Sequence, residues 1–129
     1  MAAAAKLNVA VVDDQLTMRS LVRTSLQLIG ITNVREYPTA TEALTQVVGA
    51  PPHLIISDFN MPVMDGLEFL RALRANAAMA NTAFILLTGR ADKELVARAM
   101  QFGANNYLVK PFTAATLKEK IEQVFGALT

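Results

Sequence analysis

Two hydrophobic patterns alternate along the chain. Short apolar runs of four to six residues recur, and each is followed by a longer segment in which apolar residues repeat at helical spacing. The short runs predict five strands, at Leu7–Val12, Val34–Tyr37, His53–Ser57, Ala83–Leu87 and Asn106–Val109.

The longer segments predict five helices, several of which carry recognisable end signals. Gly30 is placed to end the first helix, and Thr39 with Glu42 forms a capping box at the start of the second. The predicted helices are the apolar stripe from Met18 to Ile29, the segment from Thr39 to Gly49, Leu67–Asn76, Asp92–Phe102, and a last helix that begins at Thr113.

Two of the predicted strands are apolar at every position rather than at alternate ones. Leu54–Ile56 and Ala83–Leu87 show this pattern, which is typical of parallel strands covered on both faces. Alternation of such strands with helices predicts a three-layer α/β domain. No internal repeat or linker interrupts residues 1–129, so we expect one domain.

The composition excludes several classes of function. Hydrophobic residues make up 53% of the 129 residues, which is enough for a folded core. A net charge of +1 lacks the basic excess of a non-specific nucleic-acid binder. No uncharged stretch reaches the ~20 residues of a membrane-spanning helix, and no cysteine is present. We therefore expect a cytoplasmic protein with no nucleic-acid or membrane partner.

Polar residues follow four of the predicted strands. Asp13 and Asp14 come after the first strand, Asp58 after the third, Thr88 after the fourth and Lys110 after the fifth. If the first and third strands are adjacent, three carboxylates converge at the edge where parallel sheets bind ligands. We expect their repulsion to raise the apparent pKa of the cluster and to call for a counter-ion. Oxygen ligands of this kind suit Mg²⁺.

Each of these residues also has an ordinary structural explanation when it is taken alone. An acidic pair such as Asp13-Asp14 occurs in strand-end turns, Lys110 is a typical solvated lysine, and Tyr107 is a typical packing residue. The functional interpretation rests on their occurrence together, in this order, at four strand ends.

The sequence around these residues resembles the receiver domains of two-component response regulators. The likeness is carried by Asp13-Asp14, by Thr88 and by the stretches Ser57–Pro62, Met64–Gly66 and Tyr107–Phe112, and it covers nearly the whole chain. Within the family it is nearest to single-domain chemotaxis regulators. The resemblance implies a flavodoxin-like fold with strand order 2-1-3-4-5 and helices on both faces, and a single receiver domain with no output domain.

The resemblance also implies a role for each site residue. Asp58 is the expected phosphoryl acceptor. Asp13, Asp14, Asp58 and the backbone carbonyl of Asn60 are the expected Mg²⁺ ligands. Thr88 and Lys110 stabilise the phosphoryl group, the Lys110–Pro111 peptide is cis, and Tyr107 changes rotamer together with Thr88.

Two functions remain open at this stage, both of them non-enzymatic apart from the chain's own phosphoryl transfer and self-dephosphorylation. In the first, a histidine kinase phosphorylates a monomeric switch that binds the flagellar motor switch protein and is reset by a phosphatase. The resemblance places the motor-binding residues at Lys93, Val96, Tyr107 and Lys120. In the second, the chain is a phosphate sink or phosphorelay intermediate that binds no motor.

Some positions depart from the family pattern. Gln15 stands where phenylalanine is common, Phe59 replaces a tryptophan, and Arg90 replaces a glutamate. Arg90 is either a plain solvated residue or one that reaches the phosphorylation site. A hydrolase that forms an aspartyl phosphate would need Asp-x-Asp, whereas Asp58 is followed by Phe59-Asn60, so we do not expect an independent enzyme.

Overall fold

The computed structural model describes residues 2–89 and 92–129 of the chain. Strands and helices alternate in the order β1 (Asn8–Val12), α1 (Leu16–Leu28), β2 (Asn33–Tyr37), α2 (Ala40–Gly49), β3 (Leu54–Asp58), α3 (Gly66–Arg74), β4 (Ala83–Thr88), α4 (Lys93–Gln101), β5 (Asn106–Val109) and α5 (Ala114–Phe125). Two 3-10 helices that the pattern did not predict lie at Ala4–Lys6 and Ala77–Met79.

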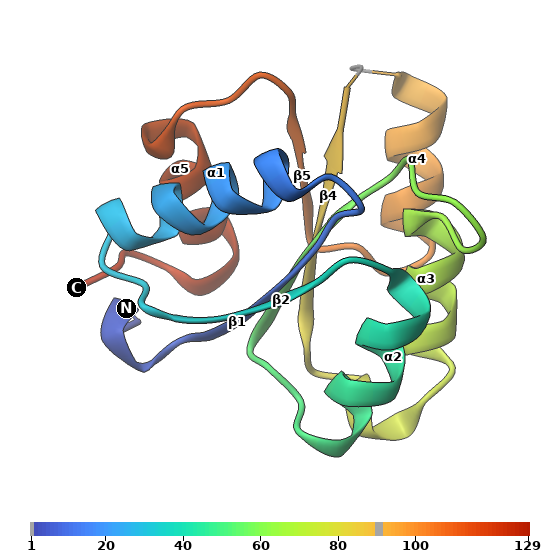
Figure 1. Ribbon diagram of the computed structural model, residues 1–129. Coiled ribbons are helices and arrows are strands. Elements are labelled where there is room, and N and C mark those ends of the chain that lie inside the picture. Colours follow the sequence, from blue (N-terminus) through green and yellow to red (C-terminus); the bar gives the residue numbers. More distant parts are fainter. Residues whose placement is uncertain (1, 90–91) are drawn as a thin grey trace.

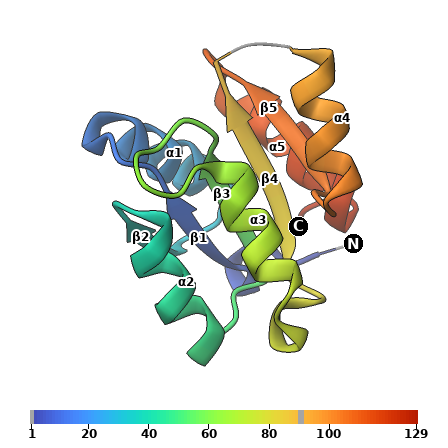
Figure 2. The same ribbon diagram turned by 90° about the vertical axis from the view of Figure 1, so that its right-hand side faces the viewer.

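The described residues form a five-stranded sheet in which every neighbouring pair is parallel. The strand order is β2-β1-β3-β4-β5, which confirms the predicted fold class. Helices α1 and α5 cover one face, and α2, α3 and α4 cover the other (Figure 1). Figure 2 views the molecule from the side of the second group. No helix of the described chain has the length and apolarity to cross a membrane.

The two faces of the sheet bury two separate cores. On β1, Val9 and Val11 pack under α1 and α5, whereas Ala10 and Val12 pack under the other three helices. This alternation follows from the strand geometry, because successive side chains point to opposite faces. Both sets are buried, so the strand is apolar throughout, as the sequence pattern indicated.

Helix boundaries differ from the predicted ones by one or two residues. Asp92 and Phe102 cap α4 and are not part of it, and Asn76 caps the 3-10 helix that follows α3. Gly30 follows α1 with a φ of +92°, in the left-handed region that glycine adopts readily, which confirms its predicted place.

The strand boundaries differ in a way that matters for the site. Asp58 and Thr88 are the last residues of β3 and β4 rather than the first residues after them, because the parallel pairing extends to Asp58–Leu87 and Thr88–Val109. Both side chains are therefore placed by sheet geometry and not by a loop.

Candidate functional site: an acidic cluster at the edge of the sheet

The predicted site residues lie at the carboxyl ends of four parallel strands. Asp13 directly follows β1, Asp58 ends β3, Thr88 ends β4 and Lys110 directly follows β5. These strand ends and the loops after them gather at the upper edge of the sheet in Figure 1. Strands β1 and β3 are adjacent, so the condition for converging carboxylates is met.

Three carboxylates come together at this edge. One oxygen from each of Asp13, Asp14 and Asp58 lies within 4.8 Å of the other two. Asp13 and Asp58 are 1% and 4% exposed, whereas Asp14 is exposed to solvent. Like charges at this separation repel and two of them are shielded from water, so the cluster favours a bound cation.

Lys110 supplies one positive charge to the cluster. Its Nζ lies 2.8 Å from Oδ1 of Asp58. The backbone N–H of Lys110 donates a 2.8 Å hydrogen bond to the carbonyl of Thr88, which ties the lysine to the end of β4. The Lys110–Pro111 peptide is cis, as expected. The lysine and the expected phosphoryl acceptor are thus an ion pair in the resting protein.

Asp13 is held firmly but keeps one oxygen free. Its backbone N–H donates to the carbonyl of Tyr37 at 3.2 Å, and its Oδ1 accepts a 2.9 Å bond from the N–H of Gln15. Its Oδ2 is buried and has no hydrogen-bond partner among the described residues. An unpartnered carboxylate oxygen beside two further carboxylates is a donor set that fits Mg²⁺.

Burial raises the pKa of Asp13 from 3.8 to about 6. The Gln15 hydrogen bond opposes this rise, and the nearby Asp58 carboxylate adds to it. Repulsion alone was expected to raise the pKa, but removal from water is the larger cause. The folded metal-free protein therefore binds a proton at Asp13 more tightly than the unfolded chain does.

This raised pKa predicts that the metal-free protein loses stability as the pH rises from about 4 to 6, because folding then has to bury a charged carboxylate. Asp13→Asn lacks this loss and keeps an acceptor for Gln15. We expect the variant to match wild type at pH 4 and to exceed it by about 1–3 kcal/mol at pH 7, at 1.36 kcal/mol per pKa unit. Urea unfolding with a chelator at both values measures this difference.

Asp14→Asn is the control for this prediction, because it removes an exposed carboxylate of the same cluster and leaves the buried one in place. Between pH 4 and pH 7 this variant should gain much less stability over wild type than Asp13→Asn does. If Asp13→Asn is more stable than wild type by the same amount at pH 4 and at pH 7, the Asp13 carboxyl is not the group responsible for the loss of stability with rising pH.

A pocket of about 550 Å³ lies beside the cluster, between β3, β4 and α4. Thr88 and Asn60 line it together with Phe59, Gly89, Asp92, Glu94, Leu95 and Arg98. A Cβ at Gly89 would meet no atom of the described residues within 4 Å. Arg90 lies outside the described residues.

Gly66 fixes the loop between β3 and α3 against the site. Its N–H donates a 2.8 Å bond to the carbonyl of Phe59. A Cβ at Gly66 would lie 2.5 Å from the carbonyl oxygen of Asp58 and 2.8 Å from the Cα of Phe59. Gly66 was predicted only as part of the motif, but the close approach of two backbone segments requires a glycine there.

The four residues expected to bind a motor protein also lie close together. Lys93, Val96 and Tyr107 line a second pocket, of about 360 Å³, with Ala97. The Nζ of Lys120 lies 4.5 Å from the centre of the Tyr107 ring, within the range of a cation–π contact. We call Lys93, Val96, Tyr107 and Lys120 the α4–β5–α5 face.

Asn106, which received no role from the sequence, fastens β5 to α5 beside this face. Its Nδ2 donates to the carbonyl of Lys120 at 3.1 Å and to Oε1 of Gln123 at 2.8 Å, and its Oδ1 accepts from the N–H of Tyr107. Helix α4 has a smaller buried surface: Ala99 is its one fully buried residue in the described structure, and Leu95 packs half-buried on the core.

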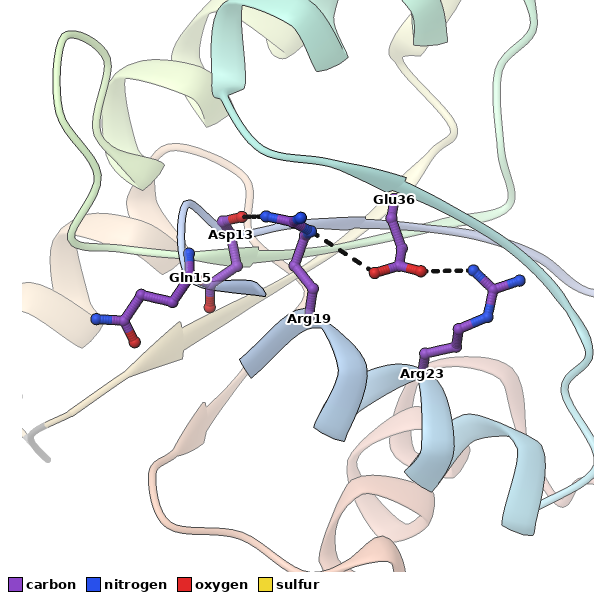
Figure 3. Close-up of polar contacts among 5 residues, drawn as sticks. All are labelled: Asp13, Gln15, Arg19, Arg23 and Glu36. Atoms are coloured by element: carbon purple, nitrogen blue, oxygen red, sulfur yellow. Dashed lines mark hydrogen bonds and ion pairs between the residues drawn. The ribbon is translucent and has the colours of Figure 1, made fainter. Parts of the chain in front are cut away.

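A network of charged side chains reaches the cluster from α1 and β2 (Figure 3). Arg19 contacts both the backbone of Asp13 and the carboxylate of Glu36, and Arg23 binds the same carboxylate. The sequence pattern did not indicate these residues. The signal that could have indicated Arg19 is its position on the apolar stripe of α1, three residues before the buried Val22.

Comparison with known proteins assigns the chain to a family. Residues 9–122 match the response regulator receiver domain, and the chain belongs to that family. The probable chemotaxis protein CheY of Rhizobium etli is 46% identical over 128 residues, which are 99% of each chain. The chain is thus a CheY-like receiver domain of two-component signalling.

Solved structures agree with this assignment. Chemotaxis protein CheY4 of Vibrio cholerae has a TM-score of 0.85 and 36% identity, over 92% of this chain and 98% of that one. The receiver domain of the sensor histidine kinase PA1611 from Pseudomonas aeruginosa has a TM-score of 0.83 and 25% identity, over 94% and 98% of the two chains. That structure holds a magnesium ion in its active-site cleft.

Proposed function

We propose that this chain is a phosphorylation-activated switch, in which a histidine kinase transfers a phosphoryl group to Asp58 and the phosphorylated form binds the flagellar motor switch. The observation that carries the proposal is the position of Asp58: it is buried beside two further carboxylates, and its Oδ1 pairs with the Nζ of Lys110 at 2.8 Å. Relatives named for chemotaxis support the choice of pathway.

The chemistry proposed for the site is a single phosphoryl transfer. A carboxylate oxygen of Asp58 forms a bond to phosphorus as the bond from phosphorus to the kinase histidine nitrogen breaks, and the electron pair stays on the imidazole, which takes up a proton. The Lys110 ammonium then neutralises phosphoryl oxygens, and the Thr88 hydroxyl donates to one of them.

Asp13, Asp14, Asp58 and the carbonyl of Asn60 are the proposed ligands of Mg²⁺. The buried Oδ2 of Asp13 supports this assignment, because it has no hydrogen-bond partner among the described residues. A bound Mg²⁺ would neutralise the charge that develops on the transferred phosphoryl oxygens.

The α4–β5–α5 face is the proposed docking surface for the motor protein. The pocket beside Val96 and Tyr107 offers an apolar seat for one side of a short amphipathic helix, and Lys93 and Lys120 offer partners for its acidic residues. We expect phosphorylation to tighten binding of such a motor segment by about 5–150-fold, the usual range of coupling between two sites.

Two variants test this face without touching Asp58. Tyr107→Ala should reduce the gain in affinity on phosphorylation, and Lys120→Glu should weaken binding more at low salt than at high salt. Anisotropy of a labelled motor-switch peptide, with and without acetyl phosphate and Mg²⁺, measures both effects. Lys118→Glu is the matched control. It makes the same change of charge, but Lys118 lies about 200° around α5 from Lys120 and so points away from this face.

The alternative function is a phosphate sink or phosphorelay intermediate. Rapid phosphotransfer without any phosphorylation-dependent affinity for segments of the cognate motor protein would favour this alternative. Phosphotransfer that survives in Tyr107→Ala and Lys120→Glu, together with a reduced gain in peptide affinity, would support the motor switch.

A further inference from the structure

Arg19 reaches the turn that carries Asp13 and Asp14 from the second turn of α1. Its Nη1 donates a 2.7 Å hydrogen bond to the backbone carbonyl of Asp13, and its side chain is 14% exposed (Figure 3). The contact is made with the backbone of Asp13 and not with its carboxylate. The influence of Arg19 on the acidic cluster therefore passes through the position of the main chain.

Glu36 on β2 holds Arg19 in place. One carboxylate oxygen of Glu36 lies 3.6 Å from Nε of Arg19, and the other accepts a hydrogen bond from Nη1 of Arg23 (Figure 3). Arg19 and Arg23 are four residues apart on α1, so they share one face of the helix and both reach the same acid. The acid also offsets part of the positive charge of Arg19.

With this contact, three polar atoms of Asp13 have fixed partners. Its N–H donates to Tyr37, its carbonyl accepts from Arg19, and its Oδ1 accepts from Gln15. Its buried Oδ2 has no hydrogen-bond partner among residues 2–89 and 92–129. The direction in which Oδ2 points is thus set by bonds to the rest of the residue.

We propose that Arg19, held by Glu36, is a positioning residue for the Mg²⁺ site. The inference rests on the proposed function, because it assigns Asp13 to the metal. Arg19 acts by holding the turn after β1 so that the free oxygen of Asp13 faces those of Asp14 and Asp58.

A positioning role and a purely electrostatic role of Arg19 predict opposite changes in Mg²⁺ affinity when the residue is replaced, which makes the proposal testable. Loss of a positive charge near three carboxylates strengthens cation binding if simple electrostatics dominates. Loss of the clamp on the Asp13 carbonyl weakens binding, because the three oxygens are no longer held in one arrangement. The direction of the change in Mg²⁺ affinity therefore separates the two effects.

The experiment is calorimetric titration of the metal-free full chain with Mg²⁺, far below its melting temperature. We expect Arg19→Met to raise the Kd by about tenfold, which is the low end for groups that orient metal ligands. Arg23→Met is the matched control. It also removes a positive charge that pairs with Glu36, but it leaves the bond between Arg19 and Asp13 in place. Its Kd for Mg²⁺ should stay within about twofold of the wild-type value. Arg19→Lys, which retains the charge, should fall between Arg19→Met and wild type.

Amide hydrogen exchange at Gln15 gives a second readout that does not involve the metal. The exchange should speed up in Arg19→Met and not in Arg23→Met, since the Gln15 N–H is bonded to Asp13. An unchanged or lower Kd in both Arg19 variants, or an equal rise in Arg23→Met, would overturn the positioning role. Wild-type protein that binds no Mg²⁺ would overturn the proposed function together with this inference.

Discussion

Asp58→Asn should remain folded and accept no phosphate from acetyl phosphate or from a phosphorylated kinase. Asparagine nearly preserves the shape of the side chain but lacks the carboxylate nucleophile. Intact mass spectrometry after incubation with Mg²⁺ should show one added phosphoryl group on wild type and none on the variant. Omission of Mg²⁺ should remove the label from wild type as well.

Asp65→Asn is the matched control for this loss. Asp65 lies in the loop that follows Asp58 and caps α3, where its side chain accepts from the N–H of Glu68, and asparagine caps helices equally well. This variant should be labelled like wild type. An acyl phosphate that mapped to another residue of the wild-type protein would refute the assignment of Asp58.

Gly66→Ala should destabilise the protein by about 2–3 kcal/mol, in the range of overpacked sites, and should slow phosphorylation. The new Cβ would meet backbone atoms of Asp58 and Phe59, and neither can turn away as a side-chain end would. The loop has to shift, and Asp58 shifts with it. Urea unfolding measures the loss of stability, and the rate of labelling by acetyl phosphate measures the displacement of the nucleophile.

Gly49→Ala makes the same chemical change where the structure has room. Gly49 is the last residue of α2, and a Cβ there would meet no atom of the described part of the chain within 4 Å. Alanine favours a helix over glycine, so this variant should be equal to wild type or up to about 1 kcal/mol more stable. Equal destabilisation of the two variants would contradict the steric explanation.

Much of the fold could be predicted from the sequence because local pattern and tertiary position agree. The run Ala83–Leu87 is apolar at every position because both faces of β4 are covered, and Thr39 and Asp65 mark helix starts by the bonds they accept. The strand order is different. The alternation of strand and helix patterns along the chain does not show which strands are neighbours in the sheet, so the predicted order came from the family resemblance.

The positions of the candidate site residues were likewise predictable where a strand end coincides with a polar residue, as at Asp13 and Lys110. The supporting contacts were not visible. Glu36 and Arg19 meet across β2 and α1, and the need for glycine at position 66 arises from the path of β3. Such contacts depend on the distance between segments in space, which a single sequence does not encode locally.

The two halves of the α4–β5–α5 face differ in their mechanical attachment. Asn106 joins β5 to α5, so Tyr107 and Lys120 are held to each other by side-chain hydrogen bonds. Helix α4, which carries Lys93 and Val96, rests on the fully buried Ala99 and the half-buried Leu95 in the described structure. A ligand that contacts both halves would lose contacts if α4 shifted relative to β5 and α5, and its dissociation rate would then rise.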